Sequence, residues 1–131
     1  MQYIFPVLLF LTACTPPAPV KNENSAGTPA SGQLVHMVFF QLKPDADKQA
    51  FFQSFETFKS IVAVKHLEIG NYEDFGQPKS DIAEHSIIVR LTFDNLAAFR
   101  QYEQHPAHLA SIEATKDMLA GPPVGYDYVV K

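Results

Sequence analysis

Residues 34–43 read Leu-Val-His-Met-Val-Phe-Phe-Gln-Leu-Lys, and this stretch decides the fold. Valine, phenylalanine and leucine dominate it, and no glycine or proline interrupts it before Pro44, which is typical of a β-strand. The alternating positions that start at Leu34 and at Val35 point to opposite faces, and both sets are largely apolar. Both faces of this sheet therefore need a cover. Because helices of so short a chain can cover only one face, the other is expected to meet a partner subunit.

The segment that follows predicts a helix packed on this sheet. Residues 44–47, Pro-Asp-Ala-Asp, supply acidic side chains that suit the start of a helix, where N–H groups are free. An apolar stripe then recurs at i, i+4, i+7 and i+11, as in an amphipathic helix: Phe51, Phe55, Phe58 and Val62. So many phenylalanines on one stripe indicate that the helix lies on a broad apolar surface.

Three further strands are expected, at 65–72, 86–93 and 124–130. Between the first two of them, residues 73–84 are polar and include glycine and proline, which indicates a loop. The strand at 86–93 alternates, with isoleucine, valine, leucine and phenylalanine on one face.

A second helix is expected after the strand at 86–93, with Asp94 as its cap. His105 and Pro106 interrupt it, and because proline suits the first turn of a helix, a new segment is expected from Pro106 to about Leu119. The resulting order is β-α-β-β-α-β. It gives the fold class as α+β, a ferredoxin-like arrangement in which the helices cross back onto one antiparallel sheet.

Composition limits the function classes. The chain has 131 residues, which fits one domain, and its formal net charge of −4 argues against a nucleic-acid-binding face. Its single cysteine excludes an intrachain disulfide and a cysteine-based zinc cluster. The sequence has neither a glycine-rich phosphate loop nor a Gly-x-Ser-x-Gly elbow, and no cofactor is implied.

The first residues indicate a bacterial lipoprotein. Residues 3–11 form an apolar run about half as long as a membrane-spanning helix, as in the core of a signal peptide. Leu11-Thr12-Ala13-Cys14 resembles the lipobox, which implies a signal peptide at 1–13 and lipid on Cys14. Met1 and Gln2 supply none of the usual basic residues. The expected location is the cell envelope, periplasmic or outer-membrane; the alternative is a chance apolar start with a stray thiol.

Residues 14–32 are expected to form a disordered tether. They contain four of the ten prolines and almost no large apolar side chain, so they cannot bury enough surface to offset the entropy of ordering. The folded domain is expected at 33–131, held away from the lipid surface by this tether.

Tyr102, His105 and His108 form a candidate acid–base group. A histidine with a pKa near neutrality can remove a proton, and a phenol can stabilise a developing oxyanion. Two other interpretations stand beside this one: the His-Pro-x-His run caps a helix junction, or its side chains contact a ligand without catalysis. His36 is either a core histidine with one hydrogen-bond partner or a pocket residue. No carboxylate at ligand spacing accompanies the histidines, so no metal site is expected.

These segments together resemble one family. The strand from His36 to Lys43, the run Tyr102-Glu-Gln-His105-Pro-Ala-His108 and the closing Tyr126-Asp-Tyr-Val129 resemble the stress-responsive A/B barrel (Dabb) family over the whole folded part. The resemblance implies a homodimer in which two sheets pack face to face into an α/β barrel.

A plant member of that family, olivetolic acid cyclase, closes a polyketide ring in a pocket between sheet and helices. By resemblance, its catalytic tyrosine and histidine match Tyr102 and His108. Its pocket histidine on the first strand matches His36, and the histidine of its His-Pro pair matches His105. The chain departs from the cyclase at several pocket positions, namely Phe55, Ser111, Ile112 and Leu119. These differences imply a pocket of another shape, so the substrate of the cyclase is not carried over to this chain.

Three functions follow as hypotheses. The first is a binding module for a small, mostly apolar molecule with a polar end, in a pocket whose ligand-binding residues are His36, Val38, Phe40, Phe51, Phe55 and His105. The second is a proton-transfer enzyme, cyclase-like or isomerase-like, with Tyr102 and His108 as catalytic residues; a monooxygenase of the related antibiotic-biosynthesis type is more distant. The third is a structural stress protein without a ligand.

Overall fold

The computed structural model of the chain describes residues 27–73, 75–76 and 87–131. The expected signal peptide, the lipidation site at Cys14 and most of the expected tether lie outside the described residues. So does most of the loop expected between the second and third strands. Within the described part, no helix is long and apolar enough to cross a membrane.

The sheet has four strands, β1 (Leu34–Phe40), β2 (His66–Asn71), β3 (Ile87–Phe93) and β4 (Val124–Val129). Their order is β2-β3-β1-β4, and every neighbouring pair is antiparallel. This is the ferredoxin-like α+β topology predicted from the sequence. β1 ends three residues earlier than expected, and beyond it Leu42 forms an isolated bridge with Leu119.

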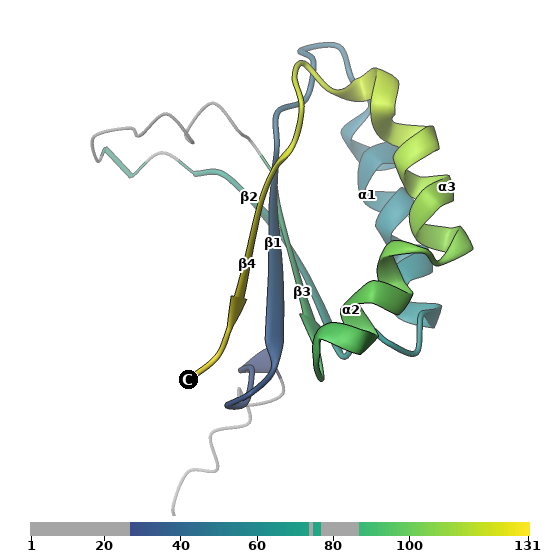
Figure 1. Cartoon of the computed structure of the whole chain (residues 1–131). Helices are drawn as coiled ribbons and strands as arrows, with labels where there is room; N and C mark the ends of the chain where they lie inside the picture. Colours follow the sequence, from purple (N-terminus) through teal and green to yellow (C-terminus); the bar gives the residue numbers. More distant parts are fainter. Residues whose placement is uncertain (1–26, 74, 77–86) are drawn as a thin grey trace, which may run out of the picture.

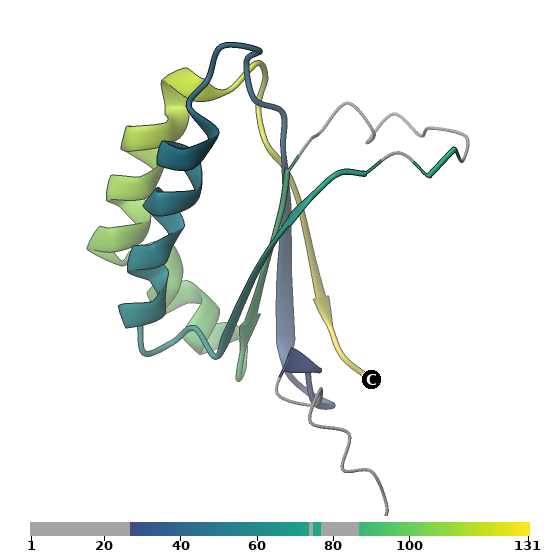
Figure 2. The ribbon, with the colours of Figure 1, turned by 180° about the vertical axis from the view of Figure 1, so that it is seen from behind.

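The helical segments that the structure describes lie on one face of the sheet (Figures 1 and 2). They are the α-helices α1 (Lys48–Glu56), α2 (Leu96–Glu103) and α3 (Pro106–Thr115), with 3₁₀ turns η2 (Thr57–Ser60) and η4 (Lys116–Met118). The interruption predicted at His105 and Pro106 is confirmed, because α2 ends before it and α3 begins at the proline.

Local capping explains where the first two helices begin. The carboxylate of Asp47 accepts a hydrogen bond from the Ala50 N–H at 3.0 Å, as expected for the start of α1. The cap predicted at Asp94 is wrong: Asn95 caps α2, its side-chain oxygen accepting from the Ala98 N–H at 3.0 Å. Asp94 instead pairs with Lys65 at 3.0 Å, and this hydrogen bond holds the pKa of Asp94 below its usual value.

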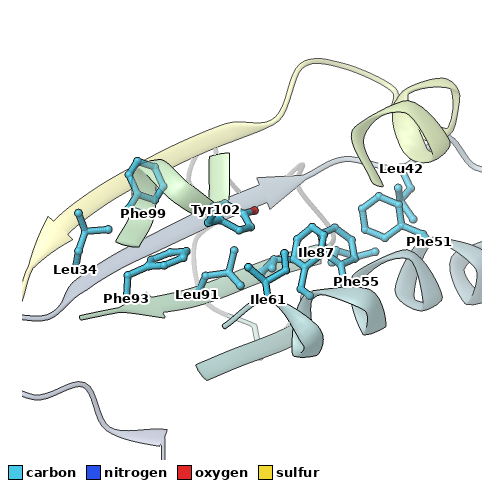
Figure 3. Packing of buried hydrophobic residues seen from close by; sticks show 12 residues of the cluster. Leu34, Leu42, Phe51, Phe55, Ile61, Ile87, Leu91, Phe93, Phe99 and Tyr102 are labelled. Carbon is cyan, nitrogen blue, oxygen red and sulfur yellow. The ribbon is translucent and has the colours of Figure 1, made fainter. Parts of the chain in front are cut away.

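The core fills the space between the sheet and the helices (Figure 3). Phe51, Phe58 and Phe93 are at most 1% exposed. The predicted apolar stripe is wrong at its last position: Val62 is 90% exposed, and Ile61 is buried in its place. The reason is the 3₁₀ turn η2, whose three residues per turn bring position 61, rather than 62, beneath Phe58.

No described helix lies over the opposite face of the sheet (Figure 1). Apolar side chains of β1, β3 and β4 lie on that face. Phe39 on β1 and Tyr126 on β4 meet edge to face there, with ring centroids 6.0 Å apart. Tyr126 and Tyr128 are about half exposed. We refer to this surface as the open face, defined by Met37, Phe39, Ile88, Tyr126 and Tyr128.

Candidate functional site

A cavity of about 270 Å³ lies between the sheet and the helices. Its apolar wall comes from β1, β3, α1 and the turns beside them, including Val38, Phe40, Phe55, Phe58, Val89 and Leu91. Its polar atoms come from five side chains: His36, Tyr102, His108, Ser111 and Thr115. A largely apolar hollow with a few polar groups is the usual form of a small-molecule site.

Tyr102 lies on α2, and its ring is buried against Phe58, Phe93 and His108. Figure 3 shows its hydroxyl directed away from Phe99, toward the end of the layer where Phe51 and Phe55 lie. The hydroxyl has no hydrogen-bond partner among the described residues, yet it is not one of their fully buried unpaired atoms, so it opens into the cavity. Burial raises the pKa of the phenol, which therefore stays protonated and acts as a hydrogen-bond donor.

His108 lies in the first turns of α3, and its ring centroid is 4.2 Å from that of Tyr102. Its Nδ1 is 3.0 Å from the backbone carbonyl oxygen of Glu103. Because a carbonyl can only accept, Nδ1 carries the proton, and in the neutral ring Nε2 holds a lone pair. Burial lowers the pKa of His108, which favours this neutral form at neutral pH. Tyr102 and His108 thus present a donor and an acceptor side by side.

His36 closes the same end of the cavity from β1. Its Nδ1 is 2.6 Å from a carboxylate oxygen of Asp127, its register partner on β4, and the ring packs against Phe99 and Tyr102. The carboxylate fixes the orientation of the imidazole. Asp127 is not among the residues selected from the sequence, although strand alternation places it on the same face as Gly125, which lines the cavity.

The structure brings together most of the residues selected from the sequence. His36, Val38, Phe40, Phe55, Tyr102 and His108 all line the cavity. The two other residues expected to bind ligand do not line it. Phe51 is fully buried in the core, behind Phe40 and Phe55. His105 caps α3, where its Nδ1 accepts a hydrogen bond from the Ala107 N–H at 3.2 Å.

Two polar residues of α3 were not among the predicted site residues. Ser111 and Thr115 follow His108 at i+3 and i+7, so the three share the inward stripe of the helix. Ser111 and Thr115 are buried, whereas Leu109 and Ile112 on the same helix are half exposed. The signal was present in the sequence: a helical repeat starting at His108 selects serine and threonine instead of the aliphatic residues beside them.

No group of three histidine, cysteine, aspartate or glutamate side chains gathers at metal-binding distance within the part of the chain that the structure describes. His36 and His108 share the cavity, but His105 is turned to the α3 backbone. The polar end of the site is therefore built from one phenol and two imidazoles.

A four-stranded antiparallel sheet in this order, with helices on one face and a cavity beneath them, defines a ferredoxin-like α+β protein. The chain belongs to the stress responsive A/B barrel (Dabb) family, whose model matches residues 34–130. This confirms the resemblance drawn from the sequence. No curated protein matches the chain.

Several solved structures share the fold. A Dabb family protein from Mesorhizobium loti is 24% identical, with a TM-score of 0.62, and the match covers 76% of this chain and 98% of that one. A dimeric ferredoxin-like protein of unknown function from Jannaschia is 20% identical, with a TM-score of 0.64 and coverage of 76% and 100%. A hydroxynitrile lyase from Passiflora edulis is 15% identical, with a TM-score of 0.63 and coverage of 78% and 96%.

Proposed function

We propose that this chain is a homodimeric, lipid-anchored protein of the bacterial cell envelope that binds a small, mostly apolar molecule with one polar end. The observation that carries the binding function is the apolar cavity of about 270 Å³ with His36, Tyr102 and His108 gathered at one end. An apolar cavity of about 150 Å³ holds a benzene molecule. The cavity here thus suits a molecule about the size of a ring with a short chain.

Native mass spectrometry of the purified dimer tests this function. The wild-type chain is expected to retain a small molecule, and His108→Ala is expected to lower its occupancy about tenfold or more, because the polar end of the ligand loses its buried partner. His105→Ala is the matched control: it removes an imidazole three residues away that lies outside the cavity, and occupancy should stay at the wild-type level.

Equal ligand retention in His108→Ala and wild type would exclude this cavity as the site. A wild-type dimer that carries no small molecule, even after exposure to a cell extract, would favour the structural stress protein instead.

A second candidate function is proton transfer. The Nε2 lone pair of His108 can act as a base beside the protonated hydroxyl of Tyr102, an arrangement suited to cyclisation or isomerisation through an oxyanion. The same measurement in D₂O separates the two candidates. A base at His108 exchanges carbon-bound hydrogen of the ligand for deuterium in the wild-type chain and not in His108→Ala, whereas a binding module exchanges none.

The homodimer is supported by the open face and by the neighbours. The open face carries apolar side chains, and Phe39 and Tyr126 meet there. No described helix lies over that side of the sheet (Figure 2). Three of the similar structures are described as dimeric. A second copy of the sheet would remove this surface from water, which is the main driving force for such association.

The lipid anchor is supported by the Leu11-Thr-Ala-Cys14 motif and by the apolar run before it. Cells fed a clickable fatty acid are expected to label the wild-type chain and to leave Cys14→Ser unlabelled, with the variant released from the membrane fraction. Two or more acyl chains hold a protein firmly on a bilayer, so the change in partitioning should be nearly complete. Labelling that survives in Cys14→Ser would place the acyl chains elsewhere and contradict the anchor.

A further inference from the structure

A surface groove of about 390 Å³ adjoins the cavity at the end of α3. Four residues line both hollows: Phe40, Ile112, Thr115 and Pro123. The other walls of the groove come from η4 and the segment up to residue 123, including Leu119 and Pro122. We call this hollow the outer groove. Because it shares residues with the cavity, only the side chains at the junction separate the two.

The two hollows follow one another along a common axis. Seven residues separate His108 from Thr115 on α3, a distance of about 10 Å at 1.5 Å per residue. β1 repeats this direction, with His36 at the polar end and Phe40 at the junction. The phenol of Tyr102 and the imidazoles of His36 and His108 therefore lie at the far end of the cavity from the outer groove, and the combined hollow is elongated.

Ile112 occupies the junction. It lines both hollows and is 51% exposed, whereas its neighbour Ser111 is buried. An aliphatic side chain that touches both hollows suits the passage of an apolar chain from one to the other.

The far end of the cavity selects the polar group that it can hold. The Tyr102 hydroxyl donates, and His108 Nε2 accepts because Nδ1 is committed to the Glu103 carbonyl. A hydroxyl or a protonated carboxyl group offers one acceptor and one donor and satisfies both. A carboxylate can only accept, so it would face the lone pair of His108 Nε2 without a hydrogen bond and is disfavoured there. Among the described residues that line the outer groove, Lys116 is the one cation, and its ammonium is paired with Glu113.

We propose that the cavity and the outer groove form one continuous site for an elongated amphiphile, with its hydroxyl or protonated carboxyl end at Tyr102 and His108 and its alkyl tail passing Ile112 into the groove. This inference rests on the proposed binding function and extends it to a ligand class. It makes Ile112 the residue that determines how long a tail the site accepts.

Straight-chain alcohols test the proposal, with calorimetric titration of hexanol, octanol, decanol and dodecanol into the full chain carrying Cys14→Ser. Each buried CH₂ group should raise affinity about fourfold, and in the otherwise unaltered chain this rise is expected to continue to dodecanol. Ile112→Trp closes the junction, so its affinities should stop rising after octanol, which is roughly as long as the cavity. Its far-ultraviolet circular dichroism spectrum, compared with that of the unaltered chain, checks that the variant is folded.

Leu109→Trp is the matched control. Leu109 is on the same helix and 52% exposed, but it lines neither hollow, so this variant should keep the full rise to dodecanol. Two results would overturn the continuous site and leave the cavity alone as a binding site. In one, affinity stops rising at octanol in the chain without either tryptophan. In the other, affinity rises to dodecanol in Ile112→Trp as it does in Leu109→Trp. Absence of binding at every chain length would overturn the proposed binding function as well.

Discussion

Replacing Ile61 by alanine is expected to lower the free energy of unfolding by about 2–5 kcal/mol, because it leaves a cavity in the core that the surroundings can only partly fill. Ile61 is 2% exposed and lies in the core cluster with Phe58. A loss of this size is a large part of the stability of a typical domain. The measurement is equilibrium unfolding in urea, followed by far-ultraviolet circular dichroism.

The neighbouring residue is the control. Val62→Ala should change the free energy of unfolding by no more than about 0.5 kcal/mol, since Val62 is 90% exposed. The milder Ile61→Val should cost about 0.5–1.5 kcal/mol, and it keeps the comparison measurable if the alanine variant fails to fold. A larger effect at Val62 than at Ile61 would contradict the register of η2 and of the core built on it.

These two residues show how far the sequence predicts the fold. The stripe was correct at Phe51 and Phe55 because both lie in α1, and it still held at Phe58 because the 3₁₀ turn begins only one residue before it. It failed at Val62 because the helix tightens into a 3₁₀ turn, and no residue between 57 and 60 signals that change. Strand identities and topology were predicted well, since alternation and length define them. The first residue of a helix depends on a single capping hydrogen bond. Where two neighbouring residues can both make that bond, the sequence does not show which one does.

The cap of α2 illustrates this limit. Asp94 and Asn95 are both good caps, and either could begin the helix. The tertiary structure decides between them: Lys65, from a distant part of the chain, takes the carboxylate of Asp94 and leaves the cap to Asn95. Such a partner is not visible in a local pattern.

The candidate site shows the same division. His36, Tyr102 and His108 could be placed at one cavity because strand alternation and the family resemblance both indicate that face. The sequence pattern could not show that His105 lies outside the cavity. Pro106 redirects the chain, and the imidazole of His105 then caps the backbone of α3. The contact between Asp127 and His36 could not be predicted from a local pattern, because the two residues are 91 apart in the sequence.

Phe39→Asp is expected to convert the dimer into a monomer, because it places a carboxylate at the centre of the open face. Phe39 is on β1, a central strand, and its side chain meets Tyr126 on the side without helices. In a twofold-symmetric interface the substitution occurs twice, so two unpaired charges must lose their water. Because each buried charge costs several kcal/mol, the dissociation constant of the dimer should rise by at least about a thousandfold. Analytical ultracentrifugation measures this constant.

Val62→Asp is the control that distinguishes disruption of the open face from the mere addition of a charge to the chain. It adds the same carboxylate to the helical side, where position 62 is open to solvent, and the dimer should persist. The fold should survive in both variants, because Phe39 faces away from the core cluster formed under the helices. A wild-type chain that is monomeric at every concentration, or a Phe39→Asp chain that sediments as a dimer, would show that the open face is not where two copies meet. The cavity, which lies on the other side of the sheet, would be unaffected by either result.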